Sequence, residues 1–218
     1  MRRIVSEMFS VRRPRRKTQH VRTQPRETSM SEKKKALVDT ATRLFAQHGY
    51  HAVGIDRIIA ESQVAKMTMY KYFPSKSRLV VEVLNTQNAA RAADIAAAVA
   101  PHSDPLEKLH AVFLWHNTWI NSATFTGCMF TNAAAEFHAE ENEILAAAAA
   151  QKDGFIRALT GILADALDAE NAEKAARRCV MLLDGATIAA QVNGRCDAAL
   201  DAWEMAAALI ESERLQVA

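Results

Sequence analysis

Residues that favour helices dominate this chain, and residues that end helices are rare. Only seven glycines and five prolines occur among 218 residues, and alanine is very common. Runs of valine, isoleucine and threonine, which favour strands, are nearly absent. Alanine is the best helix former, whereas glycine and proline are the worst. The sequence therefore predicts an all-α fold, in a chain long enough for one or two domains with hydrophobic cores.

Apolar residues recur at helical spacing between residues that commonly begin or end helices. Leu37, Ala41, Leu44 and Phe45 form one such stripe, and Gly49 follows it, where a helix often ends in glycine. Later helices have equally clear starts, because Ser75 and the pair Asp104–Pro105 are typical first residues. The pattern predicts about nine helices, near residues 31–48, 56–62, 66–72, 76–99, 105–122, 127–138, 141–168, 171–193 and 197–214.

Charge divides the chain into a basic N-terminal part and an acidic remainder. Residues 1–76 carry 17 lysines and arginines against six aspartates and glutamates, a net charge of +11. Residues 77–218 carry ten against 19, a net charge of −9. A polyanion is therefore expected to bind the N-terminal end and to be repelled by the rest.

Residues 1–30 are predicted to be a disordered basic tail, because their many arginines are interrupted by Pro14 and Pro25. Three interpretations remain open for this segment. It is a basic arm that reaches DNA, a solvated tail, or an extension upstream of a true start at Met30. The next segment, residues 31–78, remains basic without the tail, since its part up to residue 76 has a net charge of +4.

Two short predicted helices, residues 56–62 and 66–72, are separated by a tight break at residues 63–65. Such a pair, packed on a preceding amphipathic helix, is typical of a helix-turn-helix, whose second helix lies in the major groove of DNA. A corner of an ordinary helical bundle has the same spacing, so the pattern alone leaves both interpretations open. The side chains that suit contact with DNA are Lys66, Thr68, Tyr70, Lys71, Tyr72 and, at the start of the next helix, Lys76.

These side chains have different tasks in a DNA complex. Lysine neutralises phosphate, and tyrosine hydroxyls commonly bind phosphate oxygens. Thr68 offers a hydroxyl to a base edge or a methyl group to thymine. Lys76 lies in the first turn of a helix, where backbone N–H groups also attract phosphate.

Within residues 36–84, a set of landmark residues occurs in a fixed order, namely Ala41, Leu44, Phe45, Gly49, Tyr50, Ile58, Ala60, Val64, Thr68, Tyr70, Phe73, Lys76 and Leu79. With these landmarks the segment resembles the DNA-binding domain of the tetracycline-repressor (TetR/AcrR) family. The resemblance implies that Lys66, Thr68, Lys71 and Tyr72 face DNA, and that Tyr70 and Lys76 bind phosphates.

Two positions depart from the family pattern, which often has glycine where Gln63 and Met67 stand. A turn with a positive φ at Gln63 would cost about 1 kcal/mol, because a side chain crowds that conformation. Met67 adds bulk to the recognition helix and is expected to change which bases are read.

The rest of the chain, residues 79–218, is expected to be a helical ligand-binding and dimerisation domain. Residues 127–137 and 182–186 are similar to segments of one C-terminal subgroup of the family, whose members dimerise through their last two helices as a four-helix bundle. We therefore expect a homodimer interface at residues 171–193 and 197–214, with Trp203 as an anchor. A single short recognition helix also buries too little surface for specificity, which independently favours a two-fold dimer on a pseudo-palindromic operator.

The middle helices are expected to enclose a pocket for a small-molecule effector of unknown identity. Its candidate lining residues are Trp115, His116, Trp119, Cys128, Met129, Phe137 and Phe155, with Phe113, Phe125 and Phe130 in a wider set. The alternative for each aromatic residue is ordinary core packing. Cys128 is either a reactive thiol near a helix N-terminus or a small buried residue. The spacings of His110, His116, Glu136 and His138 match no metal motif.

The function expected from these features is that of a ligand-responsive transcriptional regulator. It is most simply a repressor that binds double-stranded operator DNA as a dimer and is released by its effector, although an activator fits the same residues. An enzyme lacks support, because no nucleophile–base pair or phosphate loop is present. A module that binds another protein is disfavoured by the basic N-terminal part. We expect no cofactor, no metal, no membrane span, and a cytoplasmic location, since three cysteines are too few for a disulfide framework.

Overall fold

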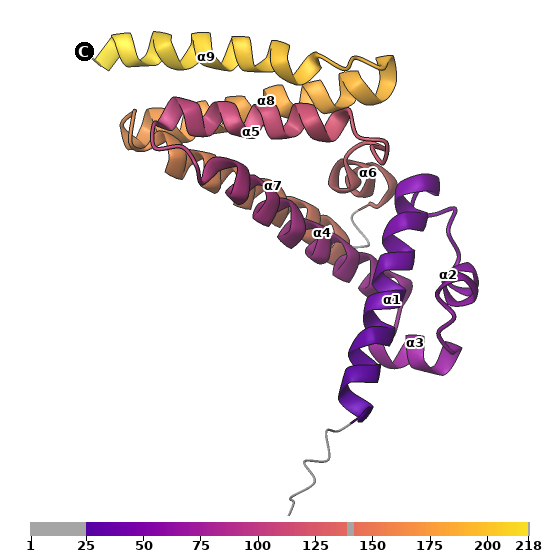
Figure 1. Ribbon diagram of the computed structural model, residues 1–218. Helices are drawn as coiled ribbons and strands as arrows, with labels where there is room; N and C mark the ends of the chain where they lie inside the picture. Colours follow the sequence, from indigo (N-terminus) through magenta and orange to yellow (C-terminus); the bar gives the residue numbers. More distant parts are fainter. Residues whose placement is uncertain (1–24, 139–141, 218) are drawn as a thin grey trace, which may run out of the picture.

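The computed structural model describes residues 25–138 and 142–217 of the chain. Over these residues the fold consists of α-helices joined by short loops, without a strand (Figure 1), which confirms the all-α prediction. The helices are α1 (Pro25–His48), α2 (Ile55–Ser62), α3 (Lys66–Tyr72), α4 (Lys76–Val99), α5 (Pro105–Ile120), α6 (Met129–Glu136), α7 (Asn142–Leu163), α8 (Ala169–Asn193) and α9 (Ala198–Val217).

Helix boundaries differ from the prediction at several helix ends, and three of these differences have a clear structural reason. Helix α1 begins at Pro25 rather than at residue 31, because proline is tolerated in the first turn, where its missing N–H is not needed. Helix α6 begins only after Gly127, whose φ of +91° is incompatible with a helix. Helix α7 ends at Leu163, and Asp168 instead caps α8 by accepting hydrogen bonds from backbone N–H groups.

The tail prediction is therefore corrected for residues 25–30, which are helical. Residues 1–24 lie outside the described residues, so their predicted disorder stays a prediction. Two predicted helix starts are confirmed. The Ser75 hydroxyl accepts a hydrogen bond from the backbone N–H of Arg78, 3.1 Å away, and the Asp104 carboxylate accepts one from that of Leu106, 2.9 Å away.

Two hydrophobic cores hold the molecule together. The first joins α1–α3 and the start of α4 to α6 and the start of α7, through buried residues such as Leu44, Leu79 and Phe130. The second lies among α5, α7, α8 and α9, around Phe113 and Leu183. The first core therefore belongs to both the N-terminal unit and the body, so that the two are packed on each other.

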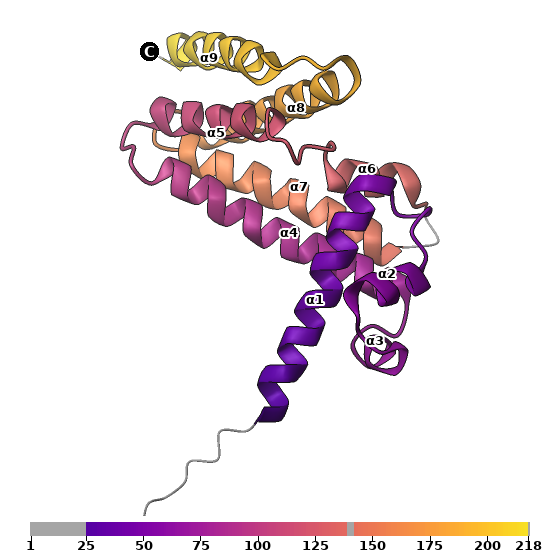
Figure 2. The same cartoon turned by 45° about the vertical axis from the view of Figure 1, so that its right-hand side comes forward.

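The arrangement of the helices separates the two ends of the molecule. Helix α4 runs from the N-terminal unit into the body beside α7, and α8 and α9 lie at the end farthest from α3 (Figures 1 and 2). In the described ranges, no helix has both the length and the apolar character needed to cross a membrane.

Candidate DNA-binding site and effector cavity

Buried apolar residues fix α2 and α3 against α1. Ile58 of α2 and Met69 of α3 are fully buried, and Val64 in the turn between them is only 5% exposed. They pack in the same core as Leu44 and Phe45 of α1. Because Met69 points inward, its neighbours along α3 on the opposite side of the helix must point to solvent.

The turn between α2 and α3 contains the strained residue that the sequence predicted. Gln63 has φ 55° and ψ 24°, the left-handed conformation, and is the one non-glycine residue with positive φ in the described part of the chain. This conformation costs about 1 kcal/mol for a residue with a side chain. Packing of Ile58 and Val64 on either side of the turn offsets that cost.

The outward face of α3 carries most of the predicted DNA contacts. Lys66 and Lys71 are exposed, the Tyr70 side chain is 41% exposed, and Met67 is 84% exposed. Thr68 and Tyr72 are half-buried. Met67, Thr68, Tyr70 and Lys71 together line a shallow open depression on the surface. The face combines a bulky apolar side chain with hydroxyls and cations, as major-groove contact requires.

Ion pairs orient the basic side chains around this face. Lys66 Nζ lies 3.1 Å from Asp56 Oδ1, and this hydrogen bond raises the pKa of Lys66, so that it stays charged. Glu61 of α2 accepts hydrogen bonds from Arg43 and Arg57, at 2.5 and 2.8 Å, which hold the pKa of its carboxyl below its usual value. Lys66, paired with Asp56, and Lys71 are thus exposed on α3, while the arginines occupy the second carboxylate of α2, that of Glu61.

Lys76 opens α4, directly after the Ser75 cap, and is half-buried. Its position at a helix N-terminus beside α3 is the one expected for a phosphate contact. Two residues later, Arg78 Nε pairs with Glu143 of α7 at 3.0 Å. This pair ties the start of α4, next to the DNA-facing surface, to the body.

The inward side chains of α2, the turn and α3 are buried, whereas the outward face of α3 is exposed and basic. This arrangement defines a helix-turn-helix DNA-binding protein. Residues 37–83 match the family model described as bacterial regulatory proteins, tetR family. The crystal structure of SCO4454, a TetR-family transcriptional regulator from Streptomyces coelicolor, is similar to that of this chain, and the two sequences are 31% identical. The match has a TM-score of 0.74 and covers 84% of this chain and 97% of that one. The chain belongs to the TetR family of transcriptional regulators.

Curated relatives are similar mainly in the N-terminal part. The HTH-type transcriptional regulator YuxN of Bacillus subtilis is 43% identical over 56 residues, which are 26% of this chain and 19% of the relative. LmrA of the same organism is 32% identical over 84 residues, 38% of this chain and 45% of the relative. The chain thus matches less than half the length of these relatives. The family consists of regulators rather than enzymes, as expected from the sequence.

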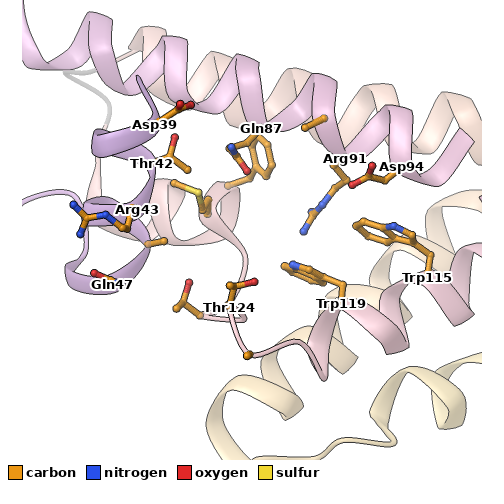
Figure 3. A pocket seen from close by; sticks show the side chains of 17 residues that line it. Asp39, Thr42, Arg43, Gln47, Gln87, Arg91, Asp94, Trp115, Trp119 and Thr124 are labelled. Carbon is orange, nitrogen blue, oxygen red and sulfur yellow. The ribbon is translucent and has the colours of Figure 1, made fainter. Parts of the chain in front are cut away.

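A cavity of about 620 Å³ lies between the N-terminal unit and the body (Figure 3). Helices α1, α4 and α5, the loop before α6 and the start of α6 form its walls, so that it is bounded by both units. Its size falls within the usual range for small-molecule sites. Its lining residues are Asp39, Thr42, Arg43, Ala46, Gln47, Gln87, Ala90, Arg91, Asp94, Trp115, Trp119, Ala123, Thr124, Thr126, Gly127, Met129 and Phe130.

Arg91 of α4 extends from one wall of this cavity towards the tryptophans of α5 (Figure 3). Its guanidinium carbon lies 4.2 Å from the ring centroid of Trp119 and 5.7 Å from that of Trp115. Its Nη1 lies 3.9 Å from the sulfur of Cys128. The Arg91 charge is therefore held on aromatic faces by cation–π contacts.

Three of the seven residues proposed for the effector pocket line the cavity, namely Trp115, Trp119 and Met129. The other four lie outside its walls. Phe137 packs in the first core against Tyr50, with ring centroids 5.5 Å apart. His116 does not line the cavity, because the residue next in the chain after Trp115 occupies another face of α5. Its ring packs on that of Phe155, with centroids 5.6 Å apart.

His116 is a buried, neutral side chain in that position. Burial lowers its pKa to about 3, and the nearby charges of Arg91 and Lys152 contribute to the same shift. Its Nδ1 lies 2.9 Å from the carbonyl oxygen of Val112, which accepts the N–H of the neutral ring. His116 is thus part of the core rather than of the cavity.

Cys128 is buried behind Arg91 rather than open to the cavity. Burial raises the pKa of its thiol, but the Arg91 guanidinium and hydrogen bonds with Thr131 outweigh burial and lower the pKa overall. Cys128 is thus a small buried residue, and its reactivity stays a prediction.

Trp203 is half-buried within the chain, and its role as a dimer anchor stays a prediction. Its ring stacks on His110 of α5, with centroids 4.5 Å apart, and touches Phe113 at 5.5 Å. It therefore joins α9 to α5 within the chain. The exposed apolar side chains of α8 and α9 are Met181, Ile188, Val192, Leu200 and Met205.

Sequence reasoning missed the polar residues of the cavity, above all Arg91. A signal was present, because Gln87, Arg91 and Asp94 follow a helical i, i+4, i+7 spacing inside an alanine-rich helix. Three polar residues on one face of such a helix indicate a polar surface. The contribution of Thr42 and Arg43 had no such signal, since they come from a distant segment.

Glu136, considered above only as a metal ligand, joins α6 to the loop after α1. Its two carboxylate oxygens accept the backbone N–H groups of Tyr50 and His51, at 3.0 and 2.8 Å. The Tyr50 hydroxyl donates to the carbonyl oxygen of Met129, 2.9 Å away. Gly49 leaves no room for a side chain beside the carboxylate, since an added Cβ would lie 2.9 Å from Glu136 Oε1. We call these bonds the Glu136 contact.

Proposed function

We propose that this regulator binds a pseudo-palindromic operator as a homodimer and that a small molecule in the cavity releases it from DNA. The observation that carries the proposal is the outward face of α3, where Lys66, Met67, Tyr70 and Lys71 are exposed while Met69 is buried. Such a face has no role in packing within the chain, and its residue types suit a major groove.

The exposed apolar side chains of α8 and α9 support a dimer. Met181 is 71% exposed, Val192 72% and Met205 62%, and Ile188 lies on the same side of α8 as Met181. A second copy of the chain would bury them in an isologous interface. This surface lies at the end of the molecule away from α3, so that pairing there leaves both recognition helices open (Figure 1).

The position of the cavity supports control by an effector. Thr42 and Arg43 of α1 line it together with Trp119 of α5. A ligand bound there touches the DNA-binding unit and the body simultaneously. It releases DNA only by binding more tightly to the arrangement that does not fit the operator.

In vitro selection of random duplex DNA with the purified chain, followed by binding measurements on the selected duplex, tests the proposal. Affinity is expected to fall steeply with salt, since lysines displace counterions from phosphates. Lys76→Ala is expected to weaken binding to every duplex, whereas Thr68→Val changes the preference among sequences. Lys174→Ala, an exposed lysine of α8, is the matched control. Equal binding by wild type and a Tyr70→Ala/Lys76→Ala double variant would overturn the assignment of α3.

Sedimentation equilibrium tests the dimer separately. Met181→Glu/Ile188→Glu is expected to give a monomer, because charges would replace apolar contact. Leu114→Glu, on an exposed site of α5 that is 44% exposed, is the control and should remain a dimer. A dimer that persists in the α8 double variant would place the interface elsewhere.

A further inference from the structure

We infer that the cavity binds a planar aromatic anion, and that Arg91 recognises its negative charge. The inference rests on the proposed function for the position of the effector site and adds the chemical class of the ligand. It depends on the charges and aromatic faces around the cavity.

The charged groups of the cavity differ in whether they already have partners. Arg43 is paired with Glu61 at 2.5 Å, and Asp39 with Lys35 at 2.5 Å. Arg91 has no carboxylate within 4.0 Å among the described residues, although it is half-buried. A partly desolvated cation without a carboxylate partner favours binding of an anion.

Asp94 is the remaining charged group, and it does not neutralise Arg91. It lies on the same side of α4, yet in the described part of the chain the two side chains form no ion pair. Asp94 is exposed to solvent, whereas Arg91 is half-buried against aromatic rings. Water screens the aspartate more strongly, so that the Arg91 charge dominates at the aromatic wall.

The aromatic wall selects the shape of the ligand. Trp115 and Trp119 lie one turn apart on α5 with their rings nearly parallel, at 12°, and their centroids 6.1 Å apart. Arg91 already covers one face of Trp119 as a cation, so a cationic ligand would meet a like charge there. A flat ring with an acidic substituent can stack on the tryptophan wall while its oxygens accept the guanidinium N–H groups.

Isothermal titration calorimetry of the full-length chain with three probes of one shape tests this inference. The probes are 2-naphthoate, 2-naphthamide and 2-naphthylmethylammonium, which differ in charge. We expect 2-naphthoate to bind at least about tenfold more tightly than 2-naphthamide, the range of a charge-assisted hydrogen bond. We expect the ammonium probe to bind more weakly than either.

Arg91→Met is expected to remove the preference for 2-naphthoate over 2-naphthamide. Arg91→Lys, which keeps the charge without the planar group, should retain part of it. Arg157→Met, at an exposed arginine of α7, is the matched control and should keep the full preference for 2-naphthoate. Circular dichroism confirms that each variant is folded, and Arg91→Lys keeps the test decisive if Arg91→Met unfolds.

Equal affinities for 2-naphthoate and 2-naphthamide, no binding of any probe, or an unchanged preference in Arg91→Met would overturn the inference. Tightest binding of the ammonium probe would also overturn it, and would assign recognition to Asp39 and Asp94. Because calorimetry uses no DNA, the outcome is separate from that of the operator experiment. A chain that prefers 2-naphthoate but binds no duplex would contradict the proposed function alone.

Discussion

The junction between the DNA-binding unit and the body is packed on one side and hollow on the other. On the α6 side, the Glu136 contact satisfies the backbone of the loop after α1, and the Tyr50 ring is buried against Phe137. On the α5 side, α1 faces the cavity lined by Arg91 and Trp119. The difference indicates that the first side fixes the two units together, while the second leaves room for a ligand to change their arrangement.

The largest expected effect comes from breaking the packed side. Glu136→Ala leaves the backbone N–H groups of Tyr50 and His51 without their acceptor, which costs roughly 2–3 kcal/mol of unfolding free energy for bonds to a charged group. Urea denaturation measures the change. Glu136→Gln keeps one oxygen acceptor and should lose about half as much. A loss below about 0.5 kcal/mol in Glu136→Ala, the range of ordinary surface substitutions, would show that the Glu136 contact does not hold the junction.

A pH effect of similar size is expected from His116, which lies behind the hollow side. Its pKa in the folded chain is about 3, below the value of 6.5 in the unfolded chain, so only the unfolded chain gains a proton as the pH falls below about 6.5. The histidine therefore leaves the free energy of unfolding unchanged above that pH. It lowers the free energy of unfolding progressively between about pH 6.5 and pH 3.

From pH 7 to pH 5 this loss amounts to about 2 kcal/mol of unfolding free energy, at 1.36 kcal/mol per pH unit. Urea denaturation at several pH values measures it. His116→Gln is expected to be less stable at pH 7 yet to show a flatter dependence on pH. Parallel pH profiles of wild type and variant would argue that His116 is not buried as a neutral ring.

The two sides should respond differently to added volume. Ala133→Leu on α6, where the side chain is fully buried, is expected to cost about 1–3 kcal/mol by overpacking. Ala46→Phe on α1 points into the cavity and should change stability by less than about 0.5 kcal/mol. Thermal denaturation of the two variants and of the wild type measures both changes in stability. Similar losses in the two would mean that the cavity does not accept a side chain.

The sequence predicted the DNA-binding unit better than the cavity, for a physical reason. The helix-turn-helix is built from consecutive residues, so its two short helices and the break between them follow from local spacing, and the strain at Gln63 follows from the resemblance to the family. The cavity joins Thr42, Arg91 and Trp119 from three helices, and no local pattern indicates that they meet. For the same reason the stacking of Trp203 on His110 was not predicted, since it depends on how α9 crosses α5.

The central claim is that the state of the cavity controls the affinity for DNA. Fluorescence anisotropy of the selected duplex with Ala46→Phe, whose ring occupies part of the cavity without a ligand, tests it most directly. We predict about tenfold weaker binding than wild type, within the usual range of coupling between two sites. Ala97→Phe, at an exposed position of α4 outside the cavity, should bind as wild type does. Unchanged affinity in Ala46→Phe would contradict the claim.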